Sequence, residues 1–333
     1  MDPLTQGALG AALPQSLAQP ARIHAAALVG LVAGMAPDLD VLIRSSEDPL
    51  LFLEYHRQFT HALVFIPVGA LIVASVCHLL FTRRWQLPFR ITVLFALLGY
   101  ATHALLDACT SYGTQLLWPF SSHRFSWDTV SVVDPLLTLP LLMLVAAAAK
   151  WRRASLAALA VIWVISYQVA GYKQQQRAQT LAWEVAAQRG HAPTEIVVRP
   201  GFANILLWRS VYRYAGYFYA DGIRAGLQLQ LYPGAAMPTL DPRRDFPWLD
   251  PDSQQARDIE RFNWFSQGYT AIAAETPSRI LDVRYSLLPH ERGGLWGIEL
   301  SEDAGSTAHA AYIVSRDMPA GTLRRYWRML RGL

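Results

Sequence analysis

Long runs of apolar residues fill the first half of the chain, and only a few charged residues interrupt them. Five runs stand out, at residues 25–43, 62–81, 91–109, 133–149 and 154–172. Most of them approach the roughly 20 residues that a helix needs to cross about 30 Å of hydrocarbon. The pattern therefore predicts a membrane α-helical bundle of about five spans in a domain over residues 1–172.

From residue 173 onward, the pattern changes to short stretches rich in Val, Ile, Leu and Tyr with partial alternation, which is typical of β-strands. These stretches are residues 195–199, 205–219, 226–232, 280–286, 294–300 and 310–315, whereas residues 173–189 and 256–274 have helical composition. We expect residues 173–333 to form a soluble α+β domain with a mainly antiparallel sheet.

Composition separates the same two halves. Of the 333 residues, 53% are hydrophobic and 16% are charged, which is too apolar for an ordinary soluble protein. Only 10 of the 29 Lys and Arg residues and 9 of the 25 Asp and Glu residues precede Lys173. The net charge of +4 comes largely from arginines of the second domain and of short loops. This modest charge gives no case for a nucleic-acid partner.

Basic residues in the short loops predict the orientation of the spans. They flank alternate span ends with no acidic residue among them: Arg22, Arg83, Arg84, Arg90, Lys150, Arg152 and Arg153. Cytoplasmic loops of membrane proteins carry such an excess of Lys and Arg. Tracing the chain from these ends places the C-terminal domain outside the cytoplasm, in the periplasm.

Ionisable residues within apolar runs need a physical reason, because Asp or His in a bilayer is costly unless it is paired, hydrated or bound to a cation. His103 and Asp107 lie four residues apart, so on one helix they face the same side. Pro37 predicts that the first span ends there, just before two more carboxylates. The orientation trace places six such residues at the outer face: Asp38, Asp40, His56, His61, His103 and Asp107.

Three His and three Asp offer mixed nitrogen and oxygen ligands, which suit Zn²⁺, Mn²⁺ or Fe²⁺. We expect a divalent ion, Zn or Mn, held by His61, His103 and Asp107, with Asp40 and His56 as further ligands. Asp38 and Arg57 are candidates for catalytic roles. Six ligands exceed the three that one catalytic ion takes, so either one or two ions fit the pattern. The simpler alternatives are satisfied intramembrane pairs and helix caps.

The loop over residues 110–133 is rich in hydroxyl and aromatic side chains and contains Arg124. Beside a metal ion, Arg124 could hold an anionic group of a substrate, since guanidinium matches phosphate and carboxylate geometry. An aromatic belt at the membrane interface explains the loop equally well. His123 and Asp134 are further candidates for substrate contact, although Asp134 before Pro135 first indicates a helix cap.

Five motifs lie within the first 135 residues: Met1-Asp2-Pro3-Leu4-Thr5 with Gly7 and Gly10, Pro37-Asp38-Leu39-Asp40, His56-Arg57 with Thr60-His61, His103 with Asp107, and Asp134-Pro135. In this order they resemble the YdjM-type family of bacterial membrane-bound metal-dependent hydrolases, which includes a LexA-regulated inner-membrane member. The resemblance implies a multi-pass hydrolase of the bacterial inner membrane, with these His and Asp residues as metal ligands. It supplies no substrate.

The chain departs from the family pattern at Thr5-Gln6, where many relatives look like Thr-His. Gln6 could reach the metal site only if the segment from Leu4 to Leu17 enters the membrane from outside. The sequence permits this arrangement but does not require it.

The function that we expect is metal-dependent hydrolysis at the outer membrane–water interface, on an amphiphilic phosphate or ester, with membrane lipid as the partner. The alternative is a non-enzymatic membrane protein whose metal site is structural or handles the cation itself. Transporters place ionisable residues near the bilayer midplane in broken helices, whereas these residues gather at one face. The sequence fixes neither the substrate nor the oligomeric state.

Overall fold

The computed structural model describes residues 1–315 and 319–333 and divides the chain into two compact units. The first unit consists of Met1–Ile43 and Tyr55–Tyr172, and the second of Arg44–Glu54 and Lys173–Leu333. The short segment Arg44–Glu54 therefore packs with residues that lie far from it in the sequence.

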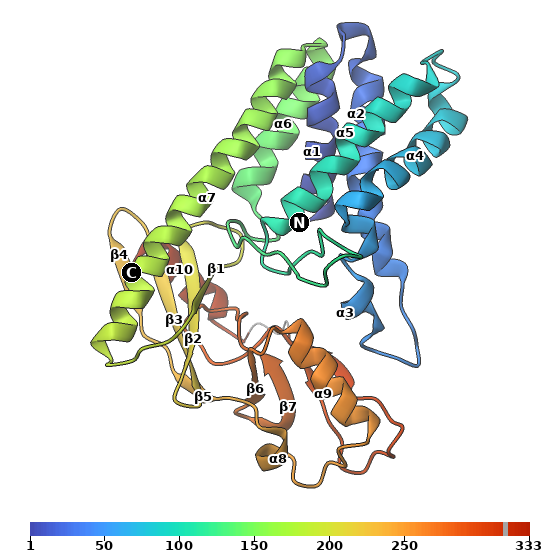
Figure 1. Ribbon diagram of the computed structural model, residues 1–333. Helices are drawn as coiled ribbons and strands as arrows, with labels where there is room; N and C mark the ends of the chain where they lie inside the picture. Colours follow the sequence, from blue (N-terminus) through green and yellow to red (C-terminus); the bar gives the residue numbers. More distant parts are fainter. Residues whose placement is uncertain (316–318) are drawn as a thin grey trace. The chain divides into compact units, whose positions relative to one another are not determined.

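The first unit is a bundle of α-helices joined by short helical turns (Figure 1). The α-helices are α1 (Pro3–Leu17), α2 (Ile23–Met35), α4 (Ile66–Cys77), α5 (Phe89–Ala108), α6 (Pro135–Trp151) and α7 (Ala154–Gln188), the last of which continues into the second unit. The turns are the 3-10 helices η1 (Pro20–Arg22), η2 (Ala36–Leu42), η3 (Phe59–His61) and η4 (Leu63–Phe65), and the π-helical turn η5 (His78–Thr82).

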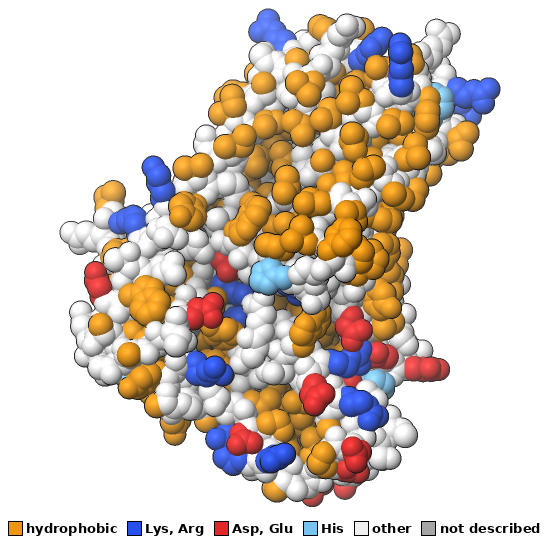
Figure 2. Space-filling model, in the orientation of Figure 1, with side chains coloured by type: hydrophobic (Ala, Val, Ile, Leu, Met, Phe, Trp, Pro, Cys, Tyr) orange, Lys and Arg blue, Asp and Glu red, His pale blue; other side chains and the backbone are white. Residues whose placement is uncertain are grey.

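Among the described residues, four helical segments are long and apolar enough to cross a membrane, namely Pro20–Leu42, Leu63–Thr82, Phe89–Ala108 and Ala154–Gln188. The shorter apolar helix α6 lies among them in the sequence. This confirms the predicted class of about five spans followed by a mixed domain. On the face shown in Figure 2, hydrophobic side chains cover the helices, and Lys and Arg side chains gather at their upper end.

Helices α1, α2 and α5 approach each other through glycines. A Cβ atom added at Gly30 would lie 2.2 Å from the carbonyl oxygen of Gly10, and one added at Gly99 would lie 2.6 Å from that of Gly30. Any larger residue would therefore push the backbones apart. Small residues allow this close approach between membrane helices, where packing rather than water exclusion drives association.

The end of the first span differs from the prediction. The α-helix stops at Met35, but the chain continues as the tighter 3-10 helix η2 through Pro37, Asp38 and Asp40. Proline is tolerated at the start of a helical segment because the amide hydrogen that it lacks has no partner there anyway. Pro37 therefore tightens the helix without ending it.

The part of the second unit that the structure describes contains two antiparallel sheets (Figure 1). The first follows the order β1 (Ile196–Pro200), β2 (Leu207–Tyr214), β3 (Tyr217–Ala225) and β4 (Leu229–Tyr232), with β5 (Ala236–Pro238) also paired to β3. The second follows the order β6 (Thr270–Ala273), β7 (Thr276–Asp282), β8 (Trp296–Glu299) and β9 (Ala311–Val314). Its helices are α3 (Leu51–Tyr55), α8 (Pro242–Asp245), α9 (Gln254–Phe265) and α10 (Thr322–Arg331).

Two predicted elements of this unit are divided differently. The stretch 205–219 contains strand β2 and the start of β3, because Ala215 and Gly216 both have positive φ and form the two-residue turn of a hairpin. The stretch 256–274 is helical only to Phe265, and its end forms strand β6. Alanines of α7 pack against buried residues of the first sheet, which gives the unit a core of its own.

Candidate metal centre

Four side chains from three elements of the first unit point at a common centre: Asp38 from η2, His61 from η3, and His103 and Asp107 from α5. The Nε2 atoms of His61 and His103 lie 2.9 Å apart. Oδ2 of Asp107 is 3.1 Å from Nε2 of His61 and 3.5 Å from Nε2 of His103. Oδ1 of Asp38 is 3.3 Å from Nε2 of His103 and 3.6 Å from Nε2 of His61.

These separations fit the ligand set of a tetrahedral ion. With metal–ligand bonds of about 2.0–2.1 Å, neighbouring ligand atoms of a tetrahedron lie about 3.3 Å apart. Five of the six distances between the four donor atoms range from 2.9 to 3.6 Å. Two imidazole nitrogens and two carboxylate oxygens are also the donors that Zn²⁺ and Mn²⁺ accept.

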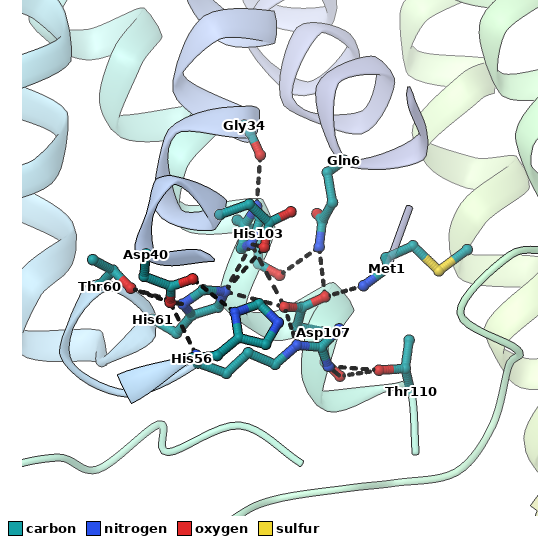
Figure 3. Close-up of polar contacts among 12 residues, drawn as sticks. Met1, Gln6, Gly34, Asp40, His56, Thr60, His61, His103, Asp107 and Thr110 are labelled. Carbon is teal, nitrogen blue, oxygen red and sulfur yellow. Dashed lines mark hydrogen bonds and ion pairs between the residues drawn. The ribbon is translucent and has the colours of Figure 1, made fainter. Parts of the chain in front are cut away.

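The outer nitrogens of the two imidazoles are occupied by hydrogen bonds (Figure 3). Nδ1 of His103 donates to the carbonyl oxygen of Gly34 at 2.6 Å. Nδ1 of His61 lies 3.0 Å from Oγ1 of Thr60 and 3.2 Å from Oδ2 of Asp40. Metal-binding histidines almost always donate their second ring nitrogen in this way, which turns the lone pair of Nε2 toward the ion. Since two lone pairs 2.9 Å apart repel, a proton or a metal ion must lie between them.

Asp40 connects this group to the residues around it. Its Oδ1 lies 2.7 Å from Nδ1 of His56, and its Oδ2 accepts hydrogen bonds from the amide of Arg57 at 2.9 Å and from Oγ1 of Thr60 at 2.8 Å. Arg57 has a φ of 63°, in the left-handed region. Its amide therefore reaches Asp40 from an unusual backbone conformation.

Asp107 is fully buried and has cationic and amide partners besides the two imidazoles. Nε of Arg57 lies 3.0 Å from Oδ2 of Asp107, and Nη1 of Arg57 donates to Oγ1 of Thr110 at 2.9 Å. Nε2 of Gln6 donates to Oδ1 of Asp107 at 2.8 Å, and the amino group of Met1 forms an ion pair with the same oxygen. Arg57, a candidate catalytic residue in the sequence, therefore contacts a candidate ligand directly.

The charge of the cluster favours cations. Burial alone would lower the pKa of His61, but hydrogen bonds to the carboxylates of Asp107, Asp38 and Asp40 raise it to about 10. The cluster therefore attracts positive charge, and protons and a metal ion would compete for the same nitrogens.

A second group of three possible ligands shares Asp38 with the first. Asp38, Asp40 and His56 each offer a donor atom, and these atoms lie within 4.8 Å of one another. The side chains of Asp38 and His56 are 20% and 18% exposed, whereas His61, His103 and Asp107 are fully buried. Asp38 therefore lies between a buried group and a more accessible one.

The three candidate substrate residues lie around the cluster in different ways. Arg124 is buried, and its guanidinium donates to the carbonyl oxygens of Gly113 and His56, so it supports the backbone at His56. Asp134 caps α6 and accepts a hydrogen bond from the hydroxyl of Tyr167 at 2.8 Å. His123 is exposed and packs edge-on against Phe125. The contacts described for Asp134 and His123 do not join them to the cluster.

Some residues of the site are outside the sequence prediction. The carbonyl oxygen of Gly34 has no signal in a side-chain pattern, because every residue carries one. Thr110 looks like an ordinary polar residue near a span end, and the motif Thr60-His61 does not by itself predict the contact of Thr60 with Asp40. Gln6 was identifiable as the variant position of the family pattern, and α1 brings it to Asp107.

Comparisons with known proteins identify a family for the first half of the chain. No solved structure matches the chain. The chain is 35% identical over 108 residues to "Inner membrane protein YbcI" of Escherichia coli, which covers 31% of this chain and 60% of that protein. It is 28% identical over 116 residues to "Uncharacterized protein YfhP" of Bacillus subtilis, which covers 35% of this chain and 34% of that protein.

Each of these matches therefore spans less than two thirds of the relative. The family model described as "YdjM inner membrane protein" matches residues 1–178, which include the whole cluster and just over half of the 333 residues. The apolar helices and this match together support a location in a membrane. The chain belongs to the YdjM inner membrane protein family.

Proposed function

We propose that this protein is a metal-dependent hydrolase of the bacterial inner membrane, with a divalent ion, zinc or manganese, at Asp38, His61, His103 and Asp107. The observation that carries the proposal is the convergence of four donor atoms on one point. In addition, a contact at Nδ1 orients each of the two imidazole rings so that its Nε2 faces that point. An ion bound there would lower the pKa of a water molecule and polarise an ester or phosphoryl oxygen.

The chain's own residues supply orientation and charge. Gly34 and Asp40 hold the imidazoles, and Arg57 and Gln6 hold the carboxylate of Asp107. Asp38 is the only partly exposed member of the four-residue group, so water and substrate would approach at its side. With Asp40 and His56 beside it, Asp38 could also share a second ion.

The surroundings of Asp38 favour an amphiphilic substrate. Leu39 and Leu42, on the same short helix η2, are 65% and 75% exposed. Exposed leucines next to a polar opening would accept an acyl chain while the ion takes the headgroup. We therefore propose a lipid phosphate or ester as the substrate class.

One observation favours the non-enzymatic alternative. Four protein ligands complete a tetrahedron, and closed four-ligand sites are typical of structural zinc, whereas catalytic sites keep one position open. The partial exposure of Asp38 favours catalysis, because an accessible carboxylate can give up its position to water or substrate. The two functions therefore differ in whether Asp38 stays bound during turnover.

The test is metal analysis of the purified protein together with turnover of amphiphilic and soluble phosphate and carboxylic esters. We expect His61→Ala and His103→Ala to lose the metal and at least about a hundredfold in rate, since a metal ion contributes several kcal/mol to such reactions. His24→Ala is the matched control, because His24 is exposed at the start of α2. Tight metal without turnover of any ester would establish the structural alternative, and a metal-free protein would refute both.

A further inference from the structure

The segment Arg44–Glu54 belongs to the second unit, although the residues on both sides of it belong to the first. Leu50 and Leu53 are 1% and 2% exposed, and the ring of Phe52 packs edge-on against Tyr312 with centroids 4.9 Å apart. This burial shows that the segment is an integral part of the second unit's packing.

Arg261 of α9 fixes both halves of the segment with one guanidinium group. Its Nη1 and Nη2 donate to the two carboxylate oxygens of Asp48 at 3.0 and 2.8 Å, and its Nε donates to Glu54 at 2.6 Å. Asp258, which is fully buried, accepts a further bond from Nη1 at 3.0 Å and lies 2.9 Å from Nδ1 of His309. Bidentate pairs of this kind are the strong form of ion pair.

The chain order connects this anchor to the metal centre. Asp40 precedes the segment by four residues, and His56 follows it by two. These two side chains contact each other at 2.7 Å, and Asp40 also contacts Nδ1 of His61. Bringing Asp40 and His56 together closes a loop that contains the whole segment, and ordering a free loop of that length costs conformational entropy.

We propose that Arg261 is a positioning residue for the metal centre, acting through the anchored segment on the Asp40–His56 pair. This inference rests on the proposed metal site. By holding Asp48 and Glu54, Arg261 lowers the conformational entropy of the segment that connects Asp40 to His56 before the ion binds. Asp40 is therefore already in place to orient His61. The second unit then contributes to metal affinity without supplying a ligand.

The geometry makes arginine specific for this role. Its planar group reaches two carboxylates of the segment and one of its own helix at the same time. A lysine keeps the charge but has a single nitrogen, so it cannot reproduce the fork. Arg261→Lys should therefore retain only part of the effect, whereas Arg261→Gln should lose it.

The experiment uses the full-length protein in lipid nanodiscs and titrates it with Zn²⁺. We expect Arg261→Gln to bind Zn²⁺ roughly tenfold more weakly, which is the size seen when groups that orient metal ligands are removed. We expect an intermediate affinity for Arg261→Lys. In the metal-free protein, hydrogen exchange at the amide of Arg57, which donates to Asp40, should accelerate by roughly tenfold in Arg261→Gln.

Arg189→Gln is the matched control. Arg189 lies in the second unit, is similarly half-buried, and makes a bidentate pair with Asp221 at 2.7 and 2.8 Å. Its loss should destabilise that unit while leaving Zn²⁺ affinity and exchange at Arg57 as in the wild type. If Arg261→Gln fails to fold, the double variant Asp48→Asn with Glu54→Gln replaces it, because it removes both acceptor charges and keeps the arginine.

The outcomes separate the two proposals. Wild-type Zn²⁺ affinity and wild-type exchange in the Arg261 variants would overturn the positioning role and leave the metal site intact. An equal loss of affinity in Arg189→Gln would also overturn it, since the effect would then reflect general stability. If the wild type binds no Zn²⁺, Mn²⁺ replaces it in the titration. If neither ion binds, the proposed function fails, and the exchange measurement alone decides whether Arg261 orders Asp40.

Discussion

Among the residues of the centre, Asp107 combines the most roles. It is fully buried, faces two imidazoles with one oxygen and receives Gln6 and the Met1 amine on the other. A carboxylate held from both sides has little freedom to rotate, so Oδ2 stays directed at the centre. The amide of Gln6 therefore helps to orient Asp107. Gln6 is also the position at which this chain departs from the Thr-His pattern that the family resemblance implies.

Gln6→Ala should weaken metal binding by roughly tenfold, because ligand-orienting groups contribute about 10–100-fold to affinity. The change leaves Oδ1 of Asp107 without its amide donor and keeps every candidate ligand. Metal titration of the variant in detergent measures the effect. Gln15→Ala is the control, since Gln15 is also buried in α1 but contacts only the carbonyl oxygen of Val145 among the partners described. Equal affinity in Gln6→Ala and the wild type would show that Arg57 and the Met1 amine orient Asp107 without help from Gln6.

The helices α1, α2 and α5 position the centre through their glycine contacts. Gly34 provides the carbonyl oxygen that holds His103, and a Cβ atom on Gly34 would lie 2.6 Å from the carbonyl oxygen of Gln6. The close approach of these backbones thus places an acceptor of α2, the amide side chain of Gln6 and the candidate ligands of α5 around one point. The fit between glycines is part of the site as well as of the fold.

Gly30→Ala tests this role of the helix crossing. The added methyl group would meet the carbonyl oxygen of Gly10 at 2.2 Å, so the helices must separate. Overpacking of this kind costs typically about 1–3 kcal/mol. We expect a lower unfolding midpoint in a thermal or denaturant titration, together with weaker metal binding as His103 moves away from Gly34. Gly305→Ala is the control, because nothing lies within 4 Å of a Cβ atom there, and an equally large loss of stability in it would refute the packing explanation.

At the scale of the whole molecule, the sequence predicts what is local or periodic and misses what is distant. The spacing of His103 and Asp107 follows from helix geometry, and the long apolar runs follow from bilayer thickness. The hairpin at Ala215 and Gly216 was missed because the pair Ala-Gly is a weaker hairpin signal than Asn-Gly or Asp-Gly. The anchor of Arg261 was not predictable either, because its partners Glu54 and Asp48 lie 207 and 213 residues away and each looks like an ordinary surface acid.

Orientation in the membrane is the remaining whole-molecule prediction. The candidate ligands and the basic residues lie at opposite ends of the spans. Asp107 is the second-to-last residue of α5, whereas Arg90 is in the first turn of α5, and Arg83 and Arg84 directly follow η5. Because basic loops face the cytoplasm, the metal centre and the second unit should face the periplasm. Single cysteines in a Cys77→Ala and Cys109→Ala background test this. Both chosen positions, Trp85 and Glu302, are exposed.

In intact spheroplasts, Glu302→Cys should react with a membrane-impermeant maleimide, whereas Trp85→Cys should react only after the membrane is opened. The physical reason is that the charged reagent cannot cross the hydrocarbon core, so labelling reports the side of each residue. Labelling of both sites in opened membranes is the control for accessibility. The reverse pattern, with Trp85→Cys labelled first, would place the metal centre at the cytoplasmic face and direct the search for its substrate to lipids of the inner leaflet.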